Sequence, residues 1–263
     1  MLLLKSSRAT KQKKEVDKMK TRLQDKRVKK YLVLDTETTT PIKMEGFTRN
    51  QLVFDIGYQI VDKKGNVFLE RSYVIEEIFY NEDYMRNAYF WEKYPQYLEG
   101  IKTGKYKVIK WFDMLVEIHN LLIECNVSVV GAYNLAFDLN TIDYTNRTLR
   151  NKPCKIFDKV EKLCIMGMSV ETLCQQKTFQ KLAMREGWIS ESGKFLSTKA
   201  ETVYKYVANQ MDYKEEHTGL EDVKIEVELM ALCFRQHKKM SKGIVHNAYK
   251  KVDIKKLGIE QVK

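Results

Sequence analysis

The sequence predicts an α/β protein in which helices cover a mixed β-sheet. Three observations predict this fold class. An apolar run lies at residues 31–34, two largely apolar stretches at 52–61 and 67–75 flank a turn, and apolar residues in later segments recur at helical spacing. Strands followed by alternating helices and strands are typical of layered α/β folds. The chain has 263 residues, 44% of them hydrophobic, so wholesale disorder is excluded.

The predicted strands follow from these apolar runs. Residues 31–34 are continuously apolar, which suits a strand buried on both faces, and residues 127–131 repeat that pattern. The stretches 52–61 and 67–75 are separated by the turn sequence Asp-Lys-Lys-Gly-Asn, which predicts a hairpin. Three strands therefore open the fold, and a further one follows later in the chain.

The predicted helices occupy most of the remaining chain. Residues 77–125 are aromatic and mostly helical in pattern, and they end in a crossover helix at 111–124. Another helix opens at 138–142, and the last runs from about 218 to 235 with one apolar stripe. Between them we expect an insertion at about 177–215, with a hairpin around Ser192-Gly193.

The charge is concentrated at the two ends of the sequence. Residues 1–30 contain 12 Lys and Arg against three Asp and Glu, and residues 238–263 contain eight against two. The middle, 31–237, has 26 cations and 30 anions. We therefore expect a domain at 31–237 between a basic N-terminal segment and a basic C-terminal tail. Such segments bind phosphates by releasing counterions, which makes nucleic acid the expected partner; the alternative is a solvated segment that serves only solubility.

Two other classes of protein lack support in the sequence: membrane or secreted proteins, and proteins stabilised by disulfides or by a zinc ribbon. No run approaches the roughly 18 apolar residues of a membrane span, and the basic start lacks a secretory apolar region, so we expect a cytoplasmic protein with no membrane partner. The five Cys are far apart and form no C-x-x-C pair, which favours buried reduced thiols over a disulfide framework or a zinc ribbon.

Asp35 and Glu37 are the first candidate site residues. They stand two apart at the end of the first apolar run, and a strand places residues two apart on the same side. Buried carboxylates without a partner are costly, and a hard divalent cation with oxygen ligands would neutralise them. The alternative is a surface turn that holds solvated acids.

Three further residues are candidates because of their positions. Asp138 follows the strand at 127–131 and begins a helix; neighbouring strand ends would bring it near Asp35, although an acid in a first helical turn is also favoured by the helix dipole. Asp222 lies early in the last helix, and His217 precedes it by five residues. Residues that are five apart do not lie on the same face of a helix. His217 is therefore expected in the preceding loop, where it could equally be a surface residue.

These residues together resemble three motifs of the DEDDh, or DnaQ-like, 3′-5′ exonuclease superfamily. The matching segments are Asp35-Thr36-Glu37-Thr38-Thr39, Asn134-x-x-Phe137-Asp138 and His217-x-x-x-x-Asp222, in the order and rough spacing of that superfamily. Asp55-Ile56-Gly57 also resembles a segment of its second strand. Tyr133 departs from the pattern, since many relatives have His before the Asn. The resemblance implies a ribonuclease H-like mixed sheet, with three antiparallel strands followed by parallel strands.

The resemblance also implies a site and a mechanism. Asp35, Glu37, Asp138 and Asp222 would hold two Mg²⁺ or Mn²⁺ ions, and His217 would act as the general base that accepts a proton from water. Thr36, Thr38, Asn134 and Phe137 would contact the substrate.

The implied function is hydrolysis of phosphodiester bonds from a 3′ end. We favour single-stranded DNA as substrate, with RNA as the alternative, and a polymerase or other replication protein as a candidate partner. The basic tails would bind phosphates. Two alternatives remain: a non-catalytic nucleic-acid- or polymerase-binding module that keeps the fold, and an endonuclease that uses the same metal site.

Overall fold

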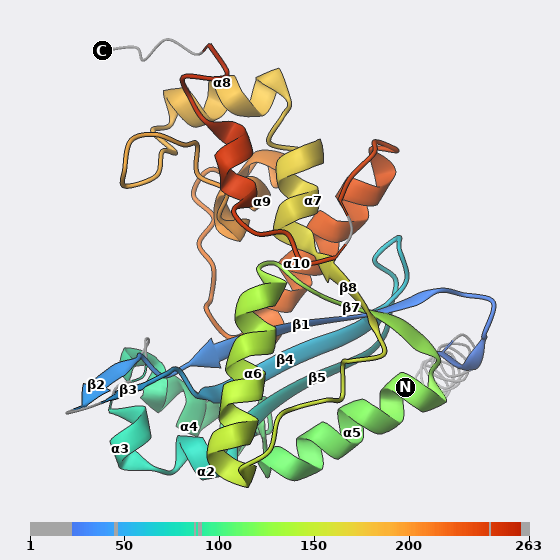
Figure 1. Cartoon of the computed structure of the whole chain (residues 1–263), viewed down its shortest axis with the longest axis vertical. Coiled ribbons are helices and arrows are strands. Elements are labelled where there is room, and N and C mark those ends of the chain that lie inside the picture. Colours follow the sequence, from blue (N-terminus) through green and yellow to red (C-terminus); the bar gives the residue numbers. More distant parts are fainter. Residues whose placement is uncertain (1–22, 45–46, 87, 89–90, 242, 259–263) are drawn as a thin grey trace, which may run out of the picture.

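The computed structural model describes residues 23–44, 47–86, 88, 91–241 and 243–258 (Figure 1). Its centre is a six-stranded sheet in the order β6-β5-β4-β1-β7-β8. The strands are β1 (Lys30–Thr38), β4 (Val53–Val61), β5 (Val67–Ile75), β6 (Lys107–Ile109), β7 (Val127–Ala132) and β8 (Glu161–Cys164). β4 pairs antiparallel with both β1 and β5, whereas β7 pairs parallel with β1 and β8. The predicted mixed sheet is confirmed.

Helices lie on both faces of this sheet (Figure 1). They are α2 (Glu76–Phe79), α3 (Glu82–Met85), α4 (Tyr94–Thr103), α5 (Trp111–Glu124), α6 (Leu135–Arg150), α7 (Ile165–Thr172), α8 (Lys177–Arg185), α9 (Ala200–Ala208) and α10 (Gly219–Arg235), with short 3-10 helices η1 (Trp91–Lys93) and η2 (Ala248–Val252). The crossover helix predicted at 111–124 is α5, and the striped helix predicted at 218–235 is α10. None of the described helices is long and apolar enough to cross a membrane.

Four short strands differ from the expected pattern. β6 lies inside the region 77–125 that was expected to be mostly helical, and it pairs parallel with the end of β5. β8 extends the sheet beyond β7, and β2 (Ile42–Met44) pairs with β3 (Phe47–Arg49) in a separate two-stranded sheet. The hairpin expected around Ser192-Gly193 corresponds to an antiparallel bridge between Ile189 and Leu196.

The two faces of β1 enter different parts of the core. Leu32 and Leu34 pack in the cluster that includes the buried side of α5, whereas Tyr31 and Val33 pack in the cluster that includes the buried side of α10. Side chains alternate between the faces of a strand. The odd-numbered residues that follow, at positions 35 and 37, therefore lie on the face that α10 covers.

The two basic ends are partly integrated into the domain. Residues 1–22 of the expected N-terminal segment lie outside the described residues, but Lys30 begins β1, is fully buried and donates a hydrogen bond to the Asp25 carbonyl at 2.7 Å. In the expected tail at 238–263, Val252 and Ile254 are buried in the same cluster as α10. Part of this segment therefore belongs to the domain, because its apolar residues complete the core.

All five Cys are free thiols, and four of them are buried, as predicted.

The start of α10 is in close backbone contact with β4. A Cβ atom on Gly57 of β4 would lie 2.1 Å from a backbone nitrogen at the start of α10, and one on Gly219 would lie 2.5 Å from the Gly57 nitrogen. Asp55 accepts hydrogen bonds from the Gly219 N–H at 3.0 Å and from the Tyr97 hydroxyl at 2.6 Å. These contacts fix the first turn of α10, which contains Asp222, against the sheet.

Substituting Gly57 by Ala is expected to destabilise the protein by about 3 kcal/mol, the upper end of the usual cost of overpacking. The new methyl group would meet backbone atoms, which cannot rotate away as a side chain can. Urea unfolding of the purified variant measures the loss. Gly131→Ala on β7 is the matched control, because its Cβ would have no neighbour closer than 3.3 Å. Equal losses in the two variants would contradict the close contact between β4 and α10.

Candidate metal centre

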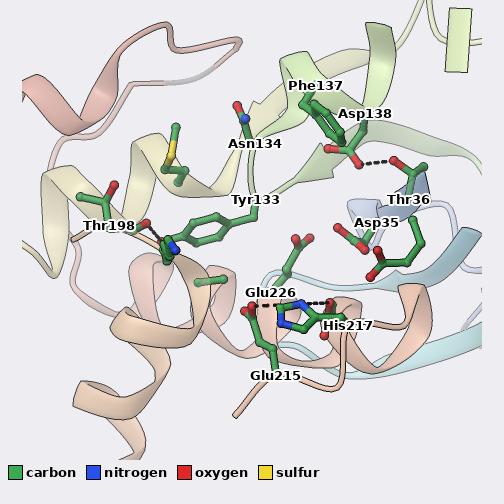
Figure 2. Close-up of a pocket in the computed structure, with 15 residues that line it drawn as sticks. Asp35, Thr36, Tyr133, Asn134, Phe137, Asp138, Thr198, Glu215, His217 and Glu226 are labelled. Carbon is green, nitrogen blue, oxygen red and sulfur yellow. Dashed lines mark hydrogen bonds and ion pairs between the residues drawn. The ribbon is translucent and has the colours of Figure 1, made fainter. Parts of the chain in front are cut away.

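A cavity of about 370 Å³ lies where β1, the end of β7, α6 and α10 meet (Figure 2). Eight of the nine predicted site residues line it: Asp35, Thr36, Glu37, Asn134, Phe137, Asp138, His217 and Asp222. The ninth, Thr38, lies outside this lining, and its hydroxyl accepts a hydrogen bond from the Gln51 side chain at 3.2 Å. The structure therefore brings residues from three distant sequence segments into one site.

β1 contributes the first two carboxyls. Glu37 is 8% exposed and Asp35 is partly buried, and both lie on the face of β1 that α10 covers. Burial raises the pKa of both carboxyls well above the ordinary range, and neighbouring acids raise it further. Without a cation, these side chains resist ionisation.

Asp138 enters the cavity from the first turn of α6. It is 2% exposed, and its Oδ1 accepts a hydrogen bond from the Thr36 hydroxyl at 2.9 Å (Figure 2). Burial raises the pKa of Asp138 to about 7, although the Thr36 hydrogen bond opposes that shift. Thr36, which was expected to contact substrate, thus orients a carboxyl. Asn134 is exposed at the end of β7, and Phe137 is half-buried beside it.

Asp222 and His217 come from α10 and from the loop before it. Asp222 is 9% exposed, its Oδ1 has no hydrogen-bond partner, and burial raises its pKa to about 8. The His217 Nδ1 lies 4.0 Å from Asp222 Oδ2, and 37% of the imidazole is exposed. His217 has a φ of 48°, in the left-handed region. The placement of His217 in the loop agrees with the expectation from its spacing to Asp222.

Two glutamates that the sequence analysis did not single out also line the cavity. Glu226 lies one helical turn after Asp222 and is 3% exposed. Its position between Val223 and Val227 places an acid within the apolar stripe of α10, and this pattern could have identified Glu226 as a candidate from the sequence. Glu215 Oε2 lies 3.9 Å from His217 Nδ1 (Figure 2), and nothing in its local sequence distinguished it from other loop acids.

The insertion expected at 177–215 forms one wall of this cavity. Thr198 and Lys199 line it from the segment before α9, and the Tyr133 hydroxyl donates a hydrogen bond to the Thr198 carbonyl at 2.7 Å (Figure 2). Tyr133 therefore connects the end of β7 to the segment before α9.

Lys93 of η1 brings a positive charge close to the site. Its ammonium group donates a hydrogen bond to the Glu216 carbonyl, one residue before His217. The charge of Lys93 opposes the burial-induced rise in the pKa of Glu37 and of Asp222. The same charge, added to the effect of burial, lowers the pKa of His217.

The donor set fits hard divalent cations. Carboxylate oxygens are the ligands that Mg²⁺ and Mn²⁺ prefer, and one ligand atom each from Glu37, His217 and Asp222 lies within 4.8 Å of the others. Buried oxygens of Asp222 and Glu226 lack hydrogen-bond partners. Buried polar atoms are normally paired, so these oxygens are suited to a bound ion.

The raised carboxyl pKa values predict how stability depends on pH. Asp138, with a pKa of about 7, and Asp222, with a pKa of about 8, bind protons in the folded state that they release when unfolded. In EDTA, the contribution of these two carboxyls to stability is therefore present in full below about pH 4 and is lost as the pH rises towards 8, by about 1 kcal/mol per pH unit for each carboxyl. Thermal unfolding in EDTA across this range measures the trend. Mg²⁺ should flatten it, and a melting temperature that rises with pH in EDTA would contradict the raised pKa values.

Comparisons with known proteins give a distant structural likeness. No family model matches the chain, and no curated protein matches it. A chain in the structure of the yeast NOT1 MIF4G domain co-crystallised with CAF1 is 11% identical, with a TM-score of 0.42 and 83% of each chain covered. The RNase domain of the yeast Pop2 protein is 10% identical, with a TM-score of 0.34, and the match covers 82% of this chain and 81% of that one.

Proposed function

We propose that this chain is a metal-dependent nuclease that hydrolyses phosphodiester bonds from the 3′ end of a nucleic acid. One observation carries the proposal. Carboxyls from β1, α6 and α10 converge in a single cavity, and the imidazole of His217 lies beside them. Such a concentration of buried acids is unfavourable without cations, and paired divalent ions bound by carboxylates are a recurrent device for cutting phosphodiesters.

The proposed role of each residue follows from its position in the cavity. Asp35, Glu37, Asp138 and Asp222 would hold two Mg²⁺ or Mn²⁺ ions, which when bound neutralise charge on the phosphate and make water more acidic. Thr36 fixes one of these carboxyls through its hydrogen bond to Asp138. The protein thereby presents a prearranged set of oxygens and does not need to reorganise when the substrate binds.

His217 is the proposed general base. Its pKa is lowered by burial and by the charge of Lys93, so the imidazole is neutral near pH 7 and can take a proton from the attacking water. The ring lies in a loop at the edge of the site, where 37% of it remains exposed. Exposure on this scale lets the accepted proton pass to solvent.

The surroundings of the cavity favour a single strand as substrate. Half-buried Phe137 and exposed Asn134 lie beside the acids, and an aromatic ring can stack on a terminal base for about 1–3 kcal/mol. Lys199 also lines the cavity and would provide positive charge for a phosphate. We favour single-stranded DNA, with RNA as the alternative.

Digestion of 5′-labelled single-stranded DNA and RNA tests this function. With Mg²⁺ or Mn²⁺ we expect a ladder that shortens from the 3′ end, and EDTA should abolish it. A circular single-stranded DNA of the same sequence should stay intact. Cleavage of the circle would instead indicate an endonuclease, and binding without any cleavage would indicate a non-catalytic nucleic-acid-binding module.

A further inference from the structure

Glu226 is a buried acid that the four-carboxylate site does not use. It lies on α10 one turn after Asp222, and its side chain extends into the cavity on the side of Asp35 (Figure 2). Only 3% of the residue is exposed, and its Oε2 has no hydrogen-bond partner. A glutamate in this position needs an explanation, because apart from Asp222 the neighbouring buried residues of α10, such as Val223 and Met230, are apolar.

The surroundings of Glu226 make its charge unfavourable in the metal-free protein. Asp138, Asp222 and Glu215 are the acids that raise its pKa beyond the effect of burial, and only a backbone hydrogen bond at Tyr133 opposes that rise among the principal influences. In turn, Glu226 is the neighbour that most strongly raises the pKa of Asp35. A glutamine of the same shape would avoid this repulsion. The metal-free fold therefore gains nothing from the negative charge.

We propose that Glu226 is a fifth carboxylate of the divalent-cation site, acting on the side of the cavity formed by Asp35 and Asp138. The inference rests on the proposed metal centre and extends it, because the resemblance implies four carboxylates and leaves Glu226 without a role. Two divalent ions balance four carboxylates, so a fifth raises the net attraction for cations. The unpartnered Oε2 provides the free acceptor that an ion, or a water bound to it, requires.

Calorimetric titration of Mn²⁺ into the metal-free full chain, without nucleic acid, tests this inference. Glu226→Gln keeps the shape and removes the charge, and we expect Mn²⁺ to bind about 10- to 100-fold more weakly to at least one site. Glu228→Gln is the matched control, because Glu228 is exposed on the same helix two residues further on. It should bind Mn²⁺ as the unaltered protein does.

Thermal unfolding separates this role from a structural one. In EDTA, Glu226→Gln should be at least as stable as the unaltered protein, since it loses a repulsive buried carboxyl, and Mn²⁺ should raise its melting temperature less. Glu226→Asp, which keeps a carboxylate, should recover part of the Mn²⁺ effect. Lower stability of Glu226→Gln in EDTA, or unchanged Mn²⁺ affinity, would overturn the proposal.

The two proposals can fail separately. A chain that binds Mn²⁺ through Glu226 but digests no nucleic acid would contradict the proposed nuclease and support the fifth carboxylate. A chain that digests nucleic acid, and whose Glu226→Gln variant binds Mn²⁺ with full affinity, would overturn the fifth carboxylate alone.

Discussion

Asp35→Asn is expected to abolish nucleolysis while the protein remains folded. Asp35 lies at the centre of the acidic cluster, where Glu226, Asp138, Glu37 and Asp222 all influence its carboxyl. Loss of one central ligand should remove about 4 kcal/mol of charge stabilisation, which corresponds to about a thousandfold in rate. The rate of release of the first nucleotide from a 5′-labelled strand, with Mg²⁺ at saturation, measures the effect.

The same substitution should stabilise the protein in EDTA, although it abolishes activity. Burial raises the pKa of Asp35, so its ionised form is unfavourable in the metal-free fold, and the neutral amide should raise the melting temperature in EDTA at pH 8. Asp113→Asn is the matched control, because Asp113 is exposed on α5 and does not line the cavity. It should leave the rate unchanged and alter stability by no more than about 1 kcal/mol, the usual contribution of an acid in a first helical turn. An Asp35→Asn variant within tenfold of full activity would contradict the assignment of Asp35.

His217→Asn is expected to lower the rate by about 10²- to 10⁴-fold, the usual contribution of a general base. Asn is the informative replacement, because it tolerates the left-handed backbone that a φ of 48° imposes and cannot accept the proton. Divalent-cation binding by the carboxylates should largely persist. Single-turnover digestion between pH 5 and 8 measures the loss.

The dependence of the rate on pH provides a second test of His217 as the general base. The pKa of His217 lies below its ordinary value of about 6.5, so the rate of the unaltered protein should stay near its maximum at pH 7 and fall only at more acidic pH. That fall should disappear from the profile of His217→Asn. His119→Ala, at an exposed position on α5, controls for loss of a histidine elsewhere. Full activity of His217→Asn near neutral pH would refute the general-base assignment.

The long elements of the fold could be predicted because their patterns are strong. α5 and α10 have enough turns for apolar spacing to stand out, and β1 is apolar on both faces because the sheet is covered on both sides. β6 could not be predicted, since three residues with a lysine at the edge of a sheet give no periodic signal. β8 is four residues long and begins with two charged side chains, so it lacked an apolar run as well.

The candidate site was predictable where a strand or helix end fixed a residue's direction. The period of two in β1 put positions 35 and 37 on one face, and the order of strands put Asp138 near them. Glu215 lines the cavity from a loop, and Lys93 acts on its carboxyls from a 3-10 helix; neither could be predicted in the same way, because only the packed chain defines these positions. Lys30 was assigned to a phosphate-binding segment, yet it is buried, because β1 begins one residue earlier than its apolar run.

Anomalous diffraction from crystals of the full chain grown with Mn²⁺ and a mononucleotide tests the central claim most directly. Two Mn²⁺ peaks in the cavity, with oxygens of Asp35, Glu37, Asp138 and Asp222 as ligands, are the predicted result. Bound Mn²⁺ elsewhere on the chain, with this cavity free of metal at saturating Mn²⁺, would contradict the claim that the converging carboxyls form a metal centre.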